Sequence, residues 1–301
     1  MVAPQHNIIA APWRYAQVAP MDDVEFAQWV DLLEERTGIN LQQNRKSFLL
    51  TSLAVRMREQ GFESYQAYFD YLVTGASGRV EWETLVDRLT VHETRFYRDE
   101  NALSVIRDVF LPSYKSENGI PTQLHYWSVG CASGEEAYTL AMLTDDYFRR
   151  QEQNYHLGIT ASDISADALS LARKAVYPAN RMTNMPVHWR GHYFAQADAG
   201  RYQIKEDIRK RICFTRINLL EIEESPVGLM DLIYCQNVLI YFKRSMRYAI
   251  LNNLVKHLSP GGMLVLGAGE IIDWNHPAIE SMTYKGSLVF RCKQDIKGKV
   301  L

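Results

Sequence analysis

A turn with two glycines separates an apolar run from a helical pattern at residues 129–136, which read V-G-C-A-S-G-E-E. In an open parallel sheet, ligands bind beyond the carboxyl ends of the strands, where a following helix offers free N–H groups to an anion. The G-x-x-x-G spacing differs from the G-x-G-x-x-G of dinucleotide sites, and no lysine follows as in a P-loop. The turn therefore indicates a ligand site of another kind, or an ordinary strand-to-helix turn.

An acidic residue closes the next apolar run. Asp163 stands 33 residues after Gly130. A carboxylate at this strand end can accept hydrogen bonds from both hydroxyls of a ribose. The alternative is that Asp163 or Ser165 caps the helix that follows. Together, the glycine turn and this carboxylate favour a nucleoside ligand.

A third apolar run, D-L-I-Y-C-Q-N-V-L-I-Y-F at 231–242, ends in Gln236 and Asn237, with Tyr241 shortly after. Polar side chains at the end of a buried strand belong at the edge of the sheet where ligands bind. The alternative is the start of a helix with an ordinary core tyrosine.

The segment V-H-E-T-R-F-Y-R-D-E-N at 91–101 packs charged and aromatic residues densely. Arg98 has the planar fork that binds a carboxylate. It could equally be a surface arginine paired with Asp99 or Glu93.

Basic residues also recur on one expected helix. Arg45 and Arg56 are eleven residues apart and share a face at 3.6 residues per turn, with Lys46 adjacent. They predict a basic stripe for an acidic helical partner, unless this face is simply solvated.

The elements that must position these residues fall into two blocks. Residues 1–20, with three prolines, predict a loose arm. Residues 21–95 predict an all-helical domain, with T-G-A-S-G closing its third helix and a fourth helix from about 80 to 89. Residues 96–301 alternate strands and helices, which predicts a doubly wound, mostly parallel α/β sheet. An insertion at about 178–210 predicts a small antiparallel β subdomain. Strands are expected at 124–130, 157–164, 212–218, within 230–242, at 261–270 and at 287–292.

Composition excludes several classes of protein. The 301 residues are 47% hydrophobic and 23% charged with a net charge of −2, which is typical of a globular chain without a basic field for nucleic acid. No apolar run approaches the roughly 20 residues of a membrane-spanning helix, and no signal peptide is expected. Four cysteines without a C-x-x-C pair predict reduced thiols and a cytoplasmic protein, and the eight scattered histidines predict no metal site.

Taken together, the motifs resemble those of one family, the CheR-type chemotaxis receptor methyltransferases, over about Val24 to Cys292. The family uses S-adenosylmethionine to methylate receptor glutamates. Its fold is a small helical domain followed by a Rossmann-like methyltransferase sheet with an inserted antiparallel subdomain. The residues that carry the resemblance are HETRFYRD (92–99), WSVGCASGEEAYTLAM (127–142), ASDIS (161–165), RYQIKEDIRKRICFTRINLL (201–220), CQNVLIYF (235–242) and SPGG…GAGE (259–270).

The resemblance also implies functions for single residues. Arg98 and Tyr241 match positions of catalytic importance. Glu136 is expected near the methionine end of the cofactor and Asp163 at its ribose. His92 stands where the family has an asparagine. The implied contacts to S-adenosylmethionine, or to the product S-adenosylhomocysteine, come from His92, Thr94, Arg98, Glu136, Asp163, Asn218, Leu219, Cys235 and Gln236.

The implied reaction is a direct displacement at the sulfonium methyl group, without a metal. A glutamate with a pKa near 4.3 is already ionised at neutral pH, so no general base is needed. The implied partner is the cytoplasmic domain of a chemoreceptor, and residues 191–204 resemble an element that docks a receptor's C-terminal peptide. Two alternatives are a methyltransferase for another carboxylate or small molecule, and a regulatory module that binds the cofactor with little turnover.

Overall fold

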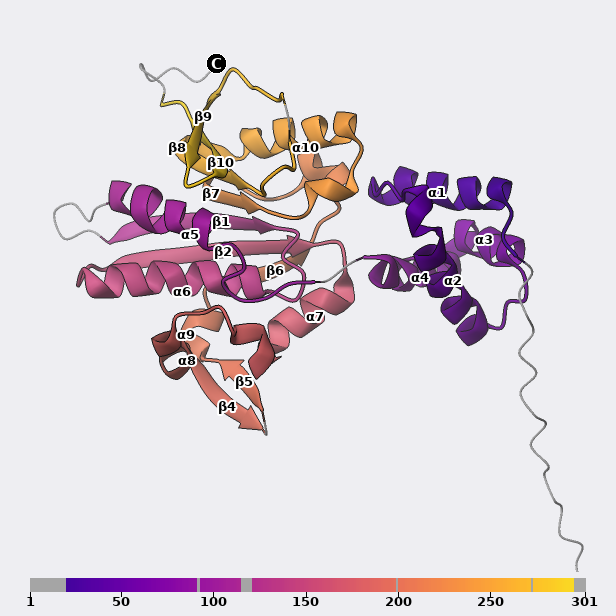
Figure 1. Ribbon diagram of the computed structural model, residues 1–301, viewed down its shortest axis with the longest axis horizontal. Helices are drawn as coiled ribbons and strands as arrows, with labels where there is room; N and C mark the ends of the chain where they lie inside the picture. The colour runs from indigo at the N-terminus through magenta and orange to yellow at the C-terminus, as the bar shows by residue number, and fades with distance from the viewer. Residues whose placement is uncertain (1–19, 91–92, 115–120, 199, 272, 295–301) are drawn as a thin grey trace, which may run out of the picture.

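In the computed structural model, the described residues are 20–90, 93–114, 121–198, 200–271 and 273–294. They form a helical part and a larger part built around a sheet (Figure 1). The arm expected at residues 1–20 therefore lies, except for Pro20, outside the described residues.

The helical part has four helices, and their buried faces form one core around Trp29, Leu53 and Tyr68. Asp22 begins the first helix with a capping box to Glu25, and Gly38 ends it in a left-handed conformation (φ 73°). The helices are α1 (Asp23–Thr37), α2 (Lys46–Gln60) after the 3-10 turn η1 (Gln43–Arg45), α3 (Tyr65–Val73) and α4 (Gly75–Leu89).

The fourth helix begins five residues earlier than predicted. The segment T-G-A-S-G does not close α3 as a loop, because Gly75 to Gly78 already form the first turn of α4. Gly78 packs against the end of α3, where an added Cβ would lie 2.1 Å from the carbonyl oxygen of Tyr71. The glycines therefore permit a tight crossing between two helices.

The predicted basic stripe on α2 is wrong, because Arg56 points into the helical core. It donates to Glu81 (Nε to Oε1, 2.8 Å), and Tyr68 donates to the same carboxylate oxygen at 2.6 Å. Lys46 pairs with Asp23 at 2.9 Å. Arg45 belongs to η1 and extends toward the sheet part.

The larger part is the predicted α/β sheet. Its described strands follow the order β6-β2-β1-β7-β8-β10-β9, with parallel pairing from β6 to β8 and antiparallel pairing of β10 with β8 and β9. The strands are β1 (Thr122–Val129), β2 (Tyr155–Asp163), β6 (Ile212–Arg216), β7 (Met230–Cys235), β8 (Leu258–Leu266), β9 (Ile279–Tyr284) and β10 (Ser287–Cys292).

Helices cover both faces of this sheet, as expected for a doubly wound fold; α6 and α10 lie on opposite sides (Figure 1). One face packs against α5 (Glu100–Val105), α6 (Glu135–Arg150) and α7 (Ala166–Lys174). The other packs against α10 (Arg244–Lys256) and the 3-10 turn η5 (Leu219–Glu224). The short π-helix η2 (Ile106–Phe110) and the 3-10 turn η3 (Leu111–Ser113) continue α5.

The predicted insertion forms a small antiparallel sheet in the order β3-β5-β4. It confirms the expected short strands, although the sheet begins two residues earlier, at Val176. Its elements are β3 (Val176–Pro178), η4 (Ala179–Met182), α8 (Val187–Tyr193), β4 (Phe194–Asp198), β5 (Arg201–Ile204) and α9 (Glu206–Arg209).

The helical part meets the sheet part through the segment that follows α1. Asn40 donates its main-chain N–H to the carbonyl oxygen of Tyr241 at 2.7 Å, and Ile39 forms an isolated bridge with Phe242. The side-chain amide of Asn218 donates to the carbonyl oxygen of Arg36 at 2.8 Å.

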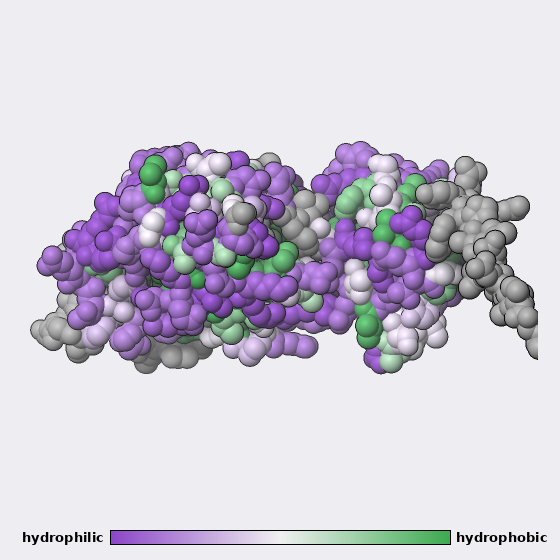
Figure 2. All heavy atoms as spheres, turned by 90° about the horizontal axis from the view of Figure 1, so that it is seen from below, coloured by the Kyte–Doolittle hydropathy of each residue, from purple (hydrophilic) through white to green (hydrophobic). Residues whose placement is uncertain are grey.

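The face seen in Figure 2 is mostly hydrophilic over both parts, with isolated apolar side chains.

Candidate active site

The register of the sheet brings the predicted motifs to one edge. Val129 of β1 pairs with Ser162 of β2 on one side and with Cys235 of β7 on the other. The residues that follow these positions therefore lie together. At the turn after β1, Gly130 has φ 71°, and an added Cβ would lie 2.3 Å from Val238 Cγ2. This close approach requires glycine.

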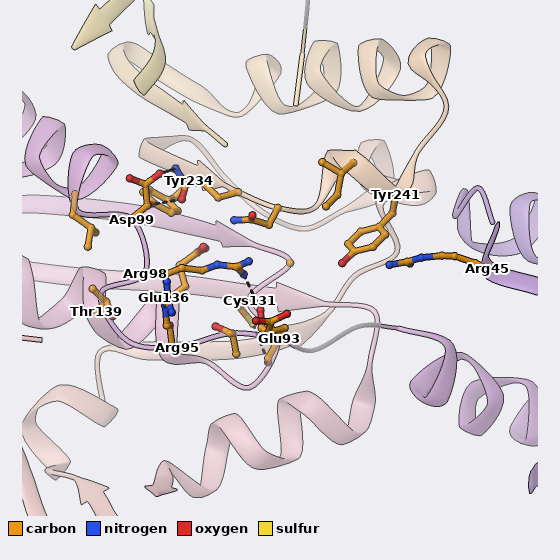
Figure 3. A pocket seen from close by; sticks show the side chains of 17 residues that line it. Arg45, Glu93, Arg95, Arg98, Asp99, Cys131, Glu136, Thr139, Tyr234 and Tyr241 are labelled. Atoms are coloured by element: carbon orange, nitrogen blue, oxygen red, sulfur yellow. Dashed lines mark hydrogen bonds between the residues drawn. The ribbon is translucent and has the colours of Figure 1, made fainter. Parts of the chain in front are cut away.

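Two adjacent cavities open at this edge, with volumes of about 250 Å³ and about 100 Å³. They share Arg45, Gly130, Ala132, Asn237 and Tyr241. The larger cavity is shown in Figure 3. Its other lining residues are Glu93, Thr94, Arg95, Arg98, Asp99, Leu103, Cys131, Glu136, Thr139, Tyr234, Gln236 and Ile240.

The smaller cavity is mainly apolar and lies between the two parts of the protein. The helical part supplies Ile39, Leu41 and Leu89, and the sheet part supplies Ile217 and Val238. A slot between apolar side chains suits a flat, weakly polar ring.

Asp163 stands at the wall of this smaller cavity. Its Oδ2 accepts the N–H of Ala132 at 2.8 Å, and its Oδ1 accepts the N–H of Ser165 at 3.0 Å. Ser165, not Asp163, caps α7 by accepting the N–H of Ala168. Each carboxylate oxygen has more than one acceptor position, so Asp163 can also accept hydroxyl groups of a ligand.

Glu136 stands at the polar end of the larger cavity. Its Oε1 accepts a hydrogen bond from Ser128 Oγ at 2.6 Å. Burial raises the pKa of Glu136 to about 8, although the hydrogen bond from Ser128 lowers it. The negative charge of Glu270 also raises this pKa, and the positive charge of Arg98 lowers it. A cationic ligand group beside this carboxyl would restore its charge.

Arg98 and Tyr241 reach the larger cavity from different elements (Figure 3). Arg98 is exposed, and its Nη1 donates to the main-chain carbonyl of Glu93 at 2.8 Å. Tyr241 ends the 3-10 turn η6 (Leu239–Tyr241). The guanidinium carbon of Arg45 lies 5.7 Å from the centre of its ring. The helical part thus contributes a cation to the same opening.

A buried carboxylate holds the turn that carries Tyr241. Glu270 Oε1 accepts the N–H groups of Val238 and Leu239 at 2.8 and 2.9 Å, and its Oε2 accepts that of Gly267 at 2.7 Å. Burial raises the pKa of Glu270, whereas these N–H groups lower it. Arg247 adds a hydrogen bond from Nε to the carbonyl of Phe242 at 2.8 Å.

The structure brings most of the predicted site residues to the two cavities. Those that line the larger one are Thr94, Arg98, Glu136, Gln236 and Tyr241. Asp163, Asn218 and Leu219 line the smaller one, as does Tyr241. The side-chain groups of Asn218 are already engaged, with Arg36 and with the N–H of Leu220. His92 lies outside the described residues.

Cys235 lines neither cavity. Successive side chains of a strand point to opposite faces, and Tyr234 and Gln236 face the larger cavity while Cys235 is fully buried in the core beneath α10. Asn237, the next residue toward Tyr241, lines both cavities instead. We therefore replace Cys235 by Asn237 in the proposed cofactor-binding set.

The sequence predicts Asn237 at the sheet edge where ligands bind and Arg45 in a basic stripe, but the family resemblance implies no cofactor contact for either residue. Neither source indicates a function for Glu270. Asn237 adopts a left-handed conformation (φ 60°), and its polar position after an apolar run was the available signal. Glu270 belongs to the quoted G-A-G-E segment, where a carboxylate directly after an apolar strand was the signal. Nothing in the local sequence indicates that Arg45 reaches Tyr241.

The described residues contain no group of three or more His, Cys, Asp or Glu side chains that could hold a metal ion. Within the same residues, no helix has the length and apolar character needed to span a membrane.

Comparison with known proteins shows which family the chain belongs to. Residues 92–286 match the family model "CheR methyltransferase, SAM binding domain", and residues 24–90 match "CheR methyltransferase, all-alpha domain". The chemotaxis protein methyltransferase of Borreliella burgdorferi is 30% identical over 254 residues, 83% of this chain and 89% of that protein. Chemotaxis protein methyltransferase 2 of Vibrio cholerae is 32% identical over 250 residues, 82% of this chain and 85% of that protein. Both parts of the chain, and the order in which they occur, are therefore accounted for by one family: the chain belongs to the CheR methyltransferases, which bind S-adenosylmethionine and methylate chemotaxis proteins.

Proposed function

We propose that this protein transfers a methyl group from S-adenosylmethionine to glutamate side chains in the cytoplasmic helices of a chemoreceptor, forming methyl esters. The observation that carries the proposal is the pair of adjacent cavities, which share Gly130, Asn237 and Tyr241 among their lining residues. One is apolar and bordered by the carboxylate of Asp163, and the other holds Glu136, Arg98 and Tyr241. The family membership supports the cofactor and the class of reaction.

The lining residues fit the parts of S-adenosylmethionine. The apolar cavity between Ile39 and Val238 suits the adenine ring, and Asp163 suits the ribose hydroxyls. Glu136 suits the cationic methionine end, because a positive group there offsets the cost of ionising a buried carboxyl. Thr94, Gln236 and Asn237 supply polar groups between these ends, and His92 stays a predicted contact.

When bound, S-adenosylmethionine supplies a methyl group that is already activated by the sulfonium. The protein then has to align the acceptor, since a glutamate is ionised at neutral pH and needs no base. We assign this alignment to Arg98, whose exposed guanidinium can orient the acceptor carboxylate. Tyr241 contributes a hydroxyl beside the path of the methyl group.

The small antiparallel sheet is the proposed docking element for a receptor's C-terminal peptide. β4 is an edge strand of this sheet, since only β5 pairs with it among the described strands. An extended peptide can add to such an edge through main-chain hydrogen bonds. Replacing Gln196 by Pro on β4 should abolish binding of that peptide, measured by calorimetry, and leave methylation of a receptor fragment without the peptide unchanged.

The test of the proposed function is transfer of a labelled methyl group to a receptor cytoplasmic fragment at saturating cofactor. The wild-type protein should label the fragment, and Arg98→Ala should lower turnover at least tenfold while binding the cofactor. Arg150→Ala is the matched control, because Arg150 is an exposed arginine on α6 that lines neither cavity. Labelling of free acids in preference to the fragment would indicate a small-molecule methyltransferase. Cofactor binding without transfer to either acceptor would indicate a regulatory module.

A further inference from the structure

A third depression, of about 350 Å³, adjoins the larger cavity. Ile240 lines both, and the residue is 49% exposed. A polypeptide that places one side chain between Arg98 and Tyr241 can therefore continue over Ile240 into this depression. We call it the α10 groove, and its lining residues are Asn40, Gln42, Ile240, Phe242, Lys243, Arg244, Arg247, Tyr248, Gly269, Glu270 and Ile271.

The groove is basic. Its cations are Lys243, Arg244 and Arg247, and Glu270 is its lining carboxylate. Glu270 is buried and accepts main-chain N–H groups, so it offers little to a partner. The larger cavity differs, because its lining contains both arginines and carboxylates: Arg45, Arg95, Arg98, Glu93, Asp99 and Glu136.

The three cations are not equally available. Arg247 is committed to main-chain carbonyl oxygens, and Lys243 pairs with Glu34 at 2.7 Å. Arg244 is held above Tyr248, donating to its hydroxyl at 2.8 Å.

Among the described residues, Asp273 is the only acidic residue that forms an ion pair with Arg244, and this pair is long. The two side chains are 3.8 Å apart and are 69% and 80% exposed. Exposed ion pairs of this kind contribute little, about 0 to 1 kcal/mol. A carboxylate from a partner can therefore replace Asp273 at little cost.

We propose that the α10 groove binds an acidic side chain of the methyl-accepting helix, with Arg244 as its contact, one or two helical turns from the glutamate being methylated. This inference rests on the proposed function. Arg244 follows Tyr241 by three residues, so their main chains lie within about 10 Å of each other. Residues four and seven positions apart on a helix are separated by about 6 and 10.5 Å along its axis. The spacing of the groove from the site thus matches that of acidic residues on one helix face.

The test uses Arg244→Glu in the full chain, with the receptor cytoplasmic fragment as acceptor. The KM for the fragment should rise at least tenfold, while kcat stays within twofold and the Kd for S-adenosylhomocysteine is unchanged. Lys256→Glu is the matched control, because Lys256 is on the same helix, is 61% exposed and also pairs with one carboxylate, that of Glu223. It should leave all three values unchanged.

A charge exchange identifies the partner residue. Acidic residues of the fragment four or seven positions from the methylated glutamate are replaced by Lys one at a time. One of these fragments should restore a low KM with Arg244→Glu. An unchanged KM in Arg244→Glu, or an equal rise in KM in Lys256→Glu, contradicts the proposed binding in the α10 groove but leaves the proposed function intact. If the wild-type protein does not methylate the fragment, both fail.

Discussion

Glu136 should make cofactor binding depend on pH. Its pKa of about 8 means that the folded protein without ligand holds the carboxyl protonated at neutral pH. We expect the ionised form to bind the cationic end of the cofactor. The apparent Kd then scales inversely with the ionised fraction, which falls from about one quarter at pH 7.5 to about 1% at pH 6. Affinity for S-adenosylhomocysteine should weaken about 25-fold over this interval.

The same group should make the unliganded fold less stable as pH rises. A glutamate in the unfolded chain loses its proton near pH 4.5, whereas the folded protein keeps the Glu136 proton until about pH 8. Between these values the unfolded state binds fewer protons, so the free energy of unfolding falls with rising pH. The slope is up to about 1.4 kcal/mol per pH unit, and the whole interval sums to about 4 to 5 kcal/mol.

Isothermal calorimetry of S-adenosylhomocysteine between pH 6 and 7.5 measures the first effect, and Glu136→Gln is its control. The variant cannot ionise at this position, so its Kd should be weaker and nearly independent of pH. Calorimetry in buffers of different ionisation enthalpy should show proton release on binding to the wild-type protein only. A wild-type Kd that stays constant over the interval, or the same slope in Glu136→Gln, would refute this reasoning.

Three further predictions concern other residues. Asp163→Asn should weaken cofactor binding ten- to hundredfold, because hydrogen bonds to a charged group contribute about 1.5 to 3 kcal/mol; a Kd within twofold of the wild type in calorimetry would remove Asp163 from the site. Arg56→Met should lower the free energy of unfolding by about 3 to 5 kcal/mol, because it leaves the buried carboxylate of Glu81 without a positive charge, with the hydrogen bond from Tyr68 remaining; a loss below about 1 kcal/mol in urea titration would contradict the buried pair. Glu270→Gln should lower kcat more than cofactor affinity. In the wild type the carboxylate accepts main-chain N–H groups, whereas the amide NH₂ of glutamine would place a donor against these donors. An unchanged kcat would show that η6 does not depend on the Glu270 carboxylate.

The parallel sheet was predictable because segments rich in apolar residues alternate with helical patterns, and several of these segments end in glycine or polar residues. β9 escaped prediction for a physical reason. It is an edge strand whose side chains are mostly solvent-accessible, so it lacks a continuous apolar run. The first turn of α4 escaped for another reason. Glycine is typical of loops, so the sequence predicts a loop at Gly75 and Gly78. The close packing of Gly78 against Tyr71 explains why glycine is needed in this helix, and the sequence does not show that contact.

Periodicity alone could not assign the faces of α2. Arg45 and Arg56 share a helical face by spacing, but the structure buries Arg56 against Glu81 and turns Arg45 toward Tyr241. Both outcomes depend on long-range contacts, since Glu81 is 25 residues away and Tyr241 belongs to the other part of the chain. The family resemblance could locate the strand that ends near Gln236, but strand alternation decides that Asn237, and not Cys235, reaches the cavities.

We propose that a glutamate carboxylate, aligned by Arg98 and Tyr241, accepts the methyl group. The most direct measurement maps the labelled position on a receptor fragment by mass spectrometry, before and after mild alkali. We predict that a glutamate gains one methyl group, that alkali releases it as methanol, and that Tyr241→Phe lowers the rate of its formation without changing its position. A label that resists alkali, or that lies on a side chain other than a carboxylate, would contradict the account.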